Sequence, residues 1–251
     1  MKKVFYIILL IFVCKAYSQT TTELTLNNFL YSKDIEVAHK SYLHIIKNQN
    51  KYKDLIYKNL IKCSRDTKQV NIPDRLIYIA TYIKDKDFIN PLTDLISNKD
   101  YSDNSCIYSC PIVFSLAIYS CFTEYKLSSK FDPKITPVKD LMETIKYINK
   151  ISLAKESPSK NCRGPGIDSL LKSTEKLSFN EIIRQAGPQN HNYKSRYAAA
   201  VVLEATTDDD KYLDDLYWLA ITEVKDASCE FRSAIYQAIY RAETARRLKN
   251  K

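Results

Sequence analysis

Glycine is scarce in this chain. Its 251 residues include only three glycines, Gly164, Gly166 and Gly187. Because glycine supplies the positive-φ turns of many β folds and the close backbone approach of phosphate-binding loops, this scarcity argues against both features. The alternation of apolar and polar residues that is typical of a half-buried strand is also weak. The sequence therefore predicts an all-α fold.

Histidine is equally scarce, which limits the chemistry that the chain can offer. His39 and His44 are five residues apart in a predicted helix and face different sides, so we interpret them as surface residues, not as ligands of a shared metal. No serine-hydrolase, zinc-protease, Walker or dinucleotide motif is present. We expect no cofactor and no metal. The catalytic alternative is an enzyme that uses His191 beside Cys162 or a serine.

The apolar run near the N-terminus predicts export. Lys2 and Lys3 precede the apolar residues 4–13, and Ala16-Tyr17-Ser18 forms a small-residue cleavage site. The run is too short to cross a bilayer, and no later segment reaches spanning length. We therefore expect residues 1–18 to be a signal peptide, and the mature protein to be periplasmic or extracellular without a transmembrane segment.

Cys14 offers a different interpretation of the same leader. A lipid-modified Cys14 would become the new N-terminus and anchor the protein to the cell envelope. Phe12 and Val13 precede it, although lipoprotein signals carry small residues there. A cleaved leader remains the favoured hypothesis.

The charge balance is basic. Loss of Lys2, Lys3 and Lys15 with the leader would lower the formal net charge from +9 to +6. A positive surface favours acidic partners through long-range attraction, although a basic but otherwise ordinary surface is the simpler interpretation. The basic residues are dispersed and form no aromatic-interleaved motif, so we expect no nucleic-acid partner.

Six cysteines remain beyond the leader. An even number in an exported chain permits up to three disulfides, and buried thiols in helices are the alternative. A zinc site would need a second close pair or an adjacent histidine near Cys106 and Cys110. The candidate disulfide cysteines are Cys63, Cys106, Cys110, Cys121, Cys162 and Cys229.

Two further features have simple structural interpretations. The segment 157–166 holds two glycines and two prolines, so it predicts an irregular loop. The acidic residues between Asp208 and Asp215 suit a hard cation but lack the spacing of a calcium loop. Capping of a helix N-terminus explains Asp208 and its acidic neighbours more simply.

Residues 195–219 carry the clearest repeated pattern, two helices joined by an acidic turn. Starting at Arg196, apolar or small residues recur at the spacing of one helix face, and Asp208 is the predicted cap of the second helix. The predicted inner faces are Ala199, Val202, Leu203, Leu213, Leu216 and Leu219.

An earlier stretch repeats this layout from Arg75. Asp87 follows Arg75 by twelve residues, which is also the spacing from Arg196 to the acidic turn. Leu92 and Leu95 then follow at the offsets of the two later leucines. A third, less complete copy begins at Arg232.

This pattern resembles HEAT repeats, in particular the short bacterial (PBS-lyase) type with V-R-x-x-A-x-x-A-L, an Asp turn and a leucine-bearing second helix. The resemblance implies an α-solenoid of antiparallel helix pairs over one domain, residues 19–251. An irregular helical bundle is the alternative. In the family the repeated Arg and Asp are structural, which implies that role for Arg75, Asp87, Arg196, Asp208 and Arg232.

The family resemblance also suggests a function. Stacked helix pairs offer a concave face to a partner, so we expect an exported protein-binding or scaffold protein without evident catalytic activity. Aromatic residues are abundant near the C-terminus, and we interpret most of them as core residues, not as interface residues. This group comprises Tyr212, Tyr217, Trp218, Tyr236 and Tyr240.

Overall fold

The computed structural model describes residues 20–65, 74–96, 111–125, 136–151, 168–222 and 229–250, and every regular element in these ranges is helical. The all-α prediction is confirmed. A first helix spans residues 20–31. It is followed by α2 (Ile35–Lys47), α3 (Gln49–Arg65), α4 (Asp74–Ile83), the 3₁₀ helix η1 (Lys86–Phe88), α5 (Ile89–Ile96), α7 (Pro111–Phe122), α8 (Thr136–Ile151), α9 (Asp168–Thr174), α10 (Phe179–Ala186), α11 (Tyr193–Thr206), α12 (Leu213–Thr222) and α13 (Cys229–Lys249).

Several helices begin where the sequence predicts. The Asp34 carboxylate accepts hydrogen bonds from the backbone N–H groups of Glu36 and Val37, which makes Asp34 the N-cap of α2. Pro111 is the first residue of α7, where its missing N–H has no helical partner to lose. Residues 111–119 are all buried, as the apolar sequence of α7 predicts, whereas its last turn, residues 120–122, is half-buried.

The N-terminal lead-in corrects one expectation. The polar, Thr-rich composition of residues 19–28 predicts a frayed segment, yet residues 20–31 form a helix. Leu26, Phe29 and Leu30 lie on one face of it and are buried in the core. Their burial outweighs the modest helix propensity of the polar residues between them.

The acidic turn after α11 corrects a second expectation, that Asp208 caps the next helix. Helix α12 begins at Leu213, five residues after Asp208, and Asp208 is exposed. Asp209 instead accepts hydrogen bonds from the Lys211 N–H and from Lys249, which also binds Asp210. Asp208 therefore does not cap the second helix, because the chain turns once more before that helix starts.

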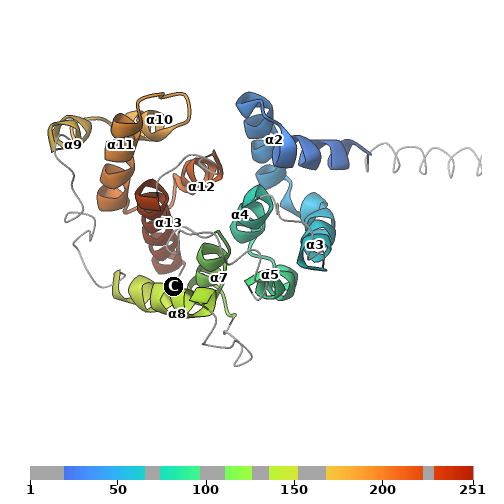
Figure 1. The fold of residues 1–251 in the computed structure, drawn as a ribbon. Helices are drawn as coiled ribbons and strands as arrows, with labels where there is room; N and C mark the ends of the chain where they lie inside the picture. The colour runs from blue at the N-terminus through green and yellow to red at the C-terminus, as the bar shows by residue number, and fades with distance from the viewer. Residues whose placement is uncertain are drawn as a thin grey trace, which may run out of the picture.

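Two groups of three helices organise the molecule (Figure 1). In the first group, α4 and α5 both pack against α7. In the second, α11 and α12 both pack against α13. The two helices of residues 195–219 thus meet a common third helix instead of packing mainly along each other.

These groups also contact each other directly. Helix α12 packs against α4, and α13 packs against α7, although these helices are far apart in sequence (Figure 1). An open solenoid stacks each helix pair only on its neighbours in sequence. The solenoid arrangement is therefore not confirmed, and these contacts agree with the alternative, an irregular bundle.

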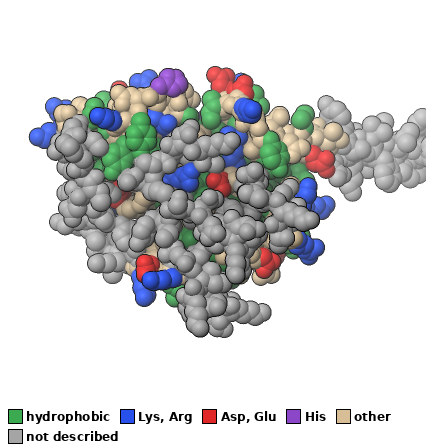
Figure 2. All heavy atoms as spheres, viewed as in Figure 1, with side chains coloured by type: hydrophobic (Ala, Val, Ile, Leu, Met, Phe, Trp, Pro, Cys, Tyr) green, Lys and Arg blue, Asp and Glu red, His purple; other side chains and the backbone are tan. Residues whose placement is uncertain are grey.

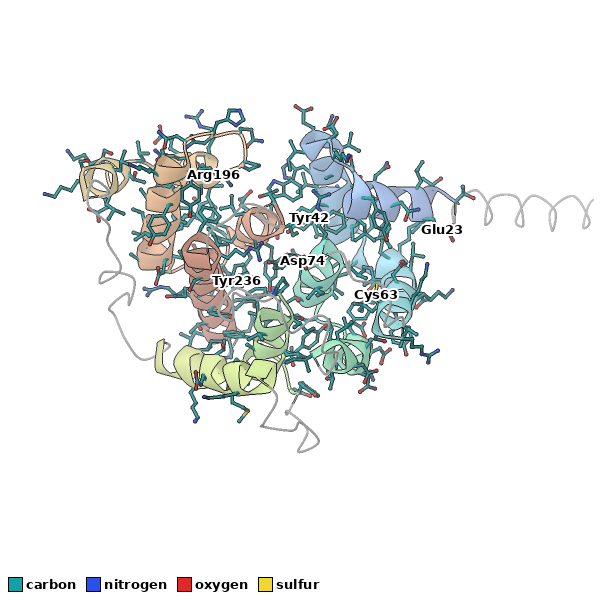
Figure 3. The ribbon with its side chains drawn as sticks, viewed as in Figure 1. Glu23, Tyr42, Cys63, Asp74, Arg196 and Tyr236 are labelled. Carbon is teal, nitrogen blue, oxygen red and sulfur yellow. The ribbon has the colours of Figure 1, made fainter. Side chains whose placement is uncertain are left out.

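Aromatic side chains fill the space where the groups meet. The Phe114 ring stacks on Tyr236 with ring centroids 4.1 Å apart, and the Tyr78 and Tyr236 hydroxyls form a hydrogen bond. Figure 3 shows Tyr236 on α13 close to the N-terminal end of α4, where Asp74 lies. Tyr217, Trp218, Tyr236 and Tyr240 are buried, as the sequence predicts for core aromatics.

Among the helices of the described residues, none is both long enough and apolar enough to cross a membrane.

Candidate functional site

The turn after α4 contains an unusual backbone conformation. Lys84 has a φ of 56°, the one positive value among the non-glycine residues that the structure describes. This is the left-handed position that ends many helices and that glycine normally occupies, because a Cβ there is crowded. A lysine in this conformation stores strain, which persists only where the surroundings impose it.

Five interactions hold this turn. The Lys84 N–H donates to the Ala80 carbonyl, 3.0 Å away. The Tyr119 hydroxyl, from α7, lies 3.1 Å from the Ala80 oxygen and 3.0 Å from the Asp85 oxygen, and so ties both sides of the turn together. The Asp85 carboxylate caps η1 through the Asp87 N–H and pairs with Lys53, 2.8 Å away. The surroundings therefore over-determine the strained conformation.

The strained backbone places the Lys84 ammonium in a buried ion pair. Lys84 Nζ lies 2.5 Å from Glu243 Oε1 of α13, and the two side chains are only 15% and 4% exposed. The Tyr217 hydroxyl donates to the same carboxylate oxygen over 3.3 Å. Burial lowers the pKa of Lys84, and the Glu243 carboxylate opposes that shift. Each charge depends on the other, because either one alone would be buried without a partner.

A pocket of about 420 Å³ lies beside this ion pair, which we call the Lys84 pocket. Its volume falls within the range of small-molecule sites, roughly 300–1,000 Å³. Its walls come from elements that are distant in sequence, and it opens to solvent where Arg246 and Asn250 are exposed. The lining residues are Gln49 of α3, residues 82–84 at the end of α4, Phe122 of α7, and Glu243, Arg246, Arg247 and Asn250 at the end of α13.

Two guanidinium groups make the Lys84 pocket basic. Arg247 Nη1 donates to the Cys121 carbonyl, 2.9 Å away, and its guanidinium lies over the Phe122 ring. Arg247 Nε is buried and has no hydrogen-bond partner within the described residues. Arg246 is exposed at the rim, and no described residue forms an ion pair with it. Since Glu243 pairs with Lys84, neither arginine has an acidic partner among the described residues, and in this sense we call both charges uncompensated.

Part of the pocket lining is apolar. Ile83, Phe122 and Tyr82 are half-buried and line the pocket. The Tyr82 hydroxyl donates to Asp214 Oδ1, 2.6 Å away, and burial together with this bond raises the pKa of Tyr82. Tyr82 is therefore neutral and held in place by its hydrogen bond. The combination of arginines and apolar side chains in the pocket suits a ligand that is anionic at one end and apolar at the other.

Arg75 and Arg196 occupy similar environments. Arg75 Nη1 donates to the Phe29 and Ser32 carbonyls at the end of the first helix, and Arg196 Nε donates to the Ala186 carbonyl at the end of α10. Burial lowers the pKa of both guanidiniums. A cation at a helix C-terminus satisfies open carbonyls and the negative end of the helix dipole.

Two further arginines make the same contact and were missed from the sequence. Arg241 Nε donates to the Thr207 carbonyl after α11, and Arg247 donates at the end of α7, as described above. Arg241 follows Arg232 within the basic final helix. The concentration of arginines in that helix was the available signal, but it did not reveal which carbonyls they reach.

The remaining predicted repeat residues are more scattered. Asp87 lies in η1, and its N–H, not its carboxylate, takes part in the cap formed by Asp85. Asp208 is exposed before α12, as noted above. Arg232 lies on α13, and its charge lowers the pKa of the buried Tyr236, opposing the larger effect of burial. The structure does not bring these residues together at the Lys84 pocket.

The cysteines are described only in part. Between Cys63 and Cys121, the two whose side chains the structure describes, no disulfide forms. Burial raises the pKa of the Cys121 thiol to about 11, and Arg247 opposes this. Of Cys229 only the backbone at the start of α13 is described. Three disulfide candidates, Cys106, Cys110 and Cys162, lie outside the described residues, and so does the lipidation candidate Cys14.

The histidines differ in how exposed their side chains are. His44 is exposed, as expected, but His39 is half-buried and stacks on Trp218 with centroids 4.5 Å apart. Burial lowers the pKa of His39, and Asp215 opposes that shift. His191 is exposed in the loop before α11, and its proposed partner Cys162 is not described. No group of three or more potential metal ligands occurs within the described ranges.

Charge is dispersed over the face of the molecule in Figure 2. Lys and Arg side chains alternate there with Asp and Glu and form no single basic patch among the described residues.

Comparison with known proteins found no matching family model, no similar curated protein and no similar solved structure. The Lys84 pocket, where burial, backbone strain and uncompensated charge coincide, is therefore the candidate site.

Proposed function

We propose that this chain is an exported, HEAT-like binding or scaffold protein, and that it recognises an acidic protein partner through the face that contains the Lys84 pocket. The observation that carries the proposal is the pair of uncompensated guanidiniums of Arg246 and Arg247 beside a buried ion pair. Arginine is enriched at the energetic centres of interfaces, and charged rims accelerate association with partners of opposite sign.

The surroundings of the pocket support a binding role. Its residues lie at the ends of packed helices, and the Lys84 turn is held by Tyr119, Lys53 and Asp85. A preorganised site loses little conformational entropy when a partner binds. The packing of α4 and α5 on α7 matches that of α11 and α12 on α13, so the two stretches with the repeated sequence pattern have similar surroundings.

The test is a crosslinking pull-down from cells that export the tagged protein, with partners identified by mass spectrometry. We expect one dominant partner with an acidic surface, and we expect Arg246→Glu to remove most of it. Lys58→Glu is the matched control, because Lys58 is exposed on α3, away from the pocket lining. Equal capture by both variants, or the lack of any enriched partner, would contradict the proposal.

Export can be tested separately. The intact mass of the protein recovered from the cell envelope or medium should correspond to cleavage after Ser18. A mass that shows a lipidated Cys14 at the N-terminus would replace the secreted form by an envelope-anchored one.

A further inference from the structure

We infer that the Lys84 pocket binds the last residue of a partner chain, with the terminal carboxylate on Arg246 and Arg247 and an apolar side chain against Phe122 and Ile83. This inference rests on the proposed function, since it assumes a protein partner. It adds the chemical group that the pocket recognises.

The charge of the pocket points to a carboxylate. Guanidinium groups present planar forks of N–H donors that match the two oxygens of a carboxylate. Arg247 already uses Nη1 on the Cys121 carbonyl, and its buried Nε still lacks a partner in the described part of the chain. Arg246 lies one residue further out, at the exposed rim. The two side chains can therefore hold one anionic group between the wall and the rim.

The size and the lining of the pocket indicate a ligand that is larger than a carboxylate group. A volume of about 420 Å³ leaves room for an attached side chain. Half-buried Ile83, Phe122 and Tyr82 provide the apolar surface for it. A chain end carries its carboxylate on the same Cα as its side chain, and capture of terminal carboxylates is a recurring mode of peptide recognition.

The remaining lining residues fit an approaching peptide. Gln49 and Asn250 lie at the pocket and carry amide groups that can bond to the last peptide unit. Glu243 would repel a carboxylate, but Lys84 neutralises it. The strained turn thus keeps a buried acid from opposing an anionic ligand, which gives the Lys84 conformation a role.

The experiment titrates the purified protein with small probes and measures binding by calorimetry. The first probe is an N-acetylated tetrapeptide that ends in phenylalanine with a free carboxylate. The second is the same peptide with a C-terminal amide, and the third is an amidated peptide that ends in glutamate. We expect both amides to bind roughly tenfold or more weakly than the free acid, since a charge-assisted bond is lost or misplaced.

Variants locate the site. Arg246→Gln should weaken the free-acid peptide by about tenfold, and Arg246→Lys, which keeps the charge but loses the fork, should give an intermediate loss. Lys58→Gln should leave the affinity unchanged. Arg246 is exposed, so these variants should fold normally, which circular dichroism would verify.

Several outcomes would overturn the inference. Equal binding of the free acid and its amide would exclude recognition of the terminus, and tight binding of the glutamate amide would indicate an internal acidic side chain. If N-acetylphenylalanine bound as tightly as the tetrapeptide, the ligand would be a free amphipathic carboxylate and not a chain end. Absence of binding by all probes, with partner capture intact, would defeat this inference alone. Probe binding without any captured partner would support the ligand class and contradict the proposed function.

Discussion

The two groups of three helices share a design but differ at one turn. In each group, a side chain of the third helix donates to a carbonyl at the end of the first. Tyr119 of α7 reaches Ala80 and Asp85, and Arg241 of α13 reaches Thr207. The last carbonyls of a helix have no hydrogen-bond partner within that helix. In both groups, the helix against which the others pack donates a hydrogen bond to such carbonyls.

The turns themselves are different. Lys84 adopts a left-handed conformation and its ammonium is buried against Glu243. At the equivalent point after α11, Thr207 has an ordinary φ of −68° and its hydroxyl donates to the Leu203 carbonyl. The acidic residues that follow it pair with Lys249 near the surface. The second group thus has a relaxed turn and the first group a strained turn, and the pocket lies at the strained one.

The largest expected difference concerns the two sets of ion pairs. Glu243→Leu should lower the free energy of unfolding by about 3 kcal/mol or more, because it leaves the Lys84 ammonium buried without a partner. Asp209→Asn removes an exposed charge partner of Lys249 and should leave stability unchanged within error. Urea denaturation of both variants measures the contrast. The double variant Lys84→Met/Glu243→Leu should recover most of the loss, and a mild effect of Glu243→Leu would show that water reaches the pair.

The next effect concerns the carbonyls at the two helix ends. Tyr119→Phe removes one hydroxyl that serves two carbonyl oxygens, so we expect a loss of about 2 kcal/mol. Arg241→Met should cost about 1 kcal/mol, because Arg241 is half-exposed and water can take its place at Thr207. The same denaturation assay compares them. A larger loss for Arg241→Met would mean that the second group depends more strongly on its third helix.

A smaller effect tests backbone strain directly. In a Glu243→Leu background, Lys84→Gly should be more stable than Lys84→Ala by about 1 kcal/mol, since glycine adopts a positive φ without crowding. At Thr207 the order should reverse, because its φ is negative and glycine there only adds freedom to the unfolded chain. Equal stability of the two Lys84 variants would argue against strain at this turn.

The smallest effect concerns the contact between α2 and the second group. Burial lowers the pKa of His39 below its ordinary value of 6.5, so the unfolded chain binds this proton more tightly than the folded protein. Stability should therefore be complete well above pH 6.5 and fall as the pH decreases through that value. His39→Gln should flatten this part of the curve of unfolding free energy against pH, and an unchanged slope would assign it to other groups.

Some parts of this structure follow from local sequence. The Asp34 cap, the start of α7 at Pro111 and the buried face of α2 depend on neighbouring residues only, so spacing and residue type predict them. Arg75 and Arg196 were singled out by their matched positions in the sequence. The guanidinium of each binds a carbonyl at the C-terminal end of another helix. The first helix was missed because its polar composition conceals three buried apolar residues at helical spacing.

The candidate site shows where local information ends. Nothing in the sequence around Lys84 marks a buried ammonium, because its partner Glu243 lies on the last helix and Tyr119 on another. Nor does the sequence near Arg247 indicate that its guanidinium meets the end of α7. Each of these contacts joins segments that only the tertiary packing of the helices brings together.

The sequence by itself thus determined the all-α class, the places of most helices and the faces that they bury, because helix periodicity, capping and turn residues act within a few positions. Only the tertiary structure decided how α4 meets α12 and α7 meets α13, since apolar faces are non-directional and specify burial but not a partner. The pocket, its charges and the strained lysine exist because of that choice of partners.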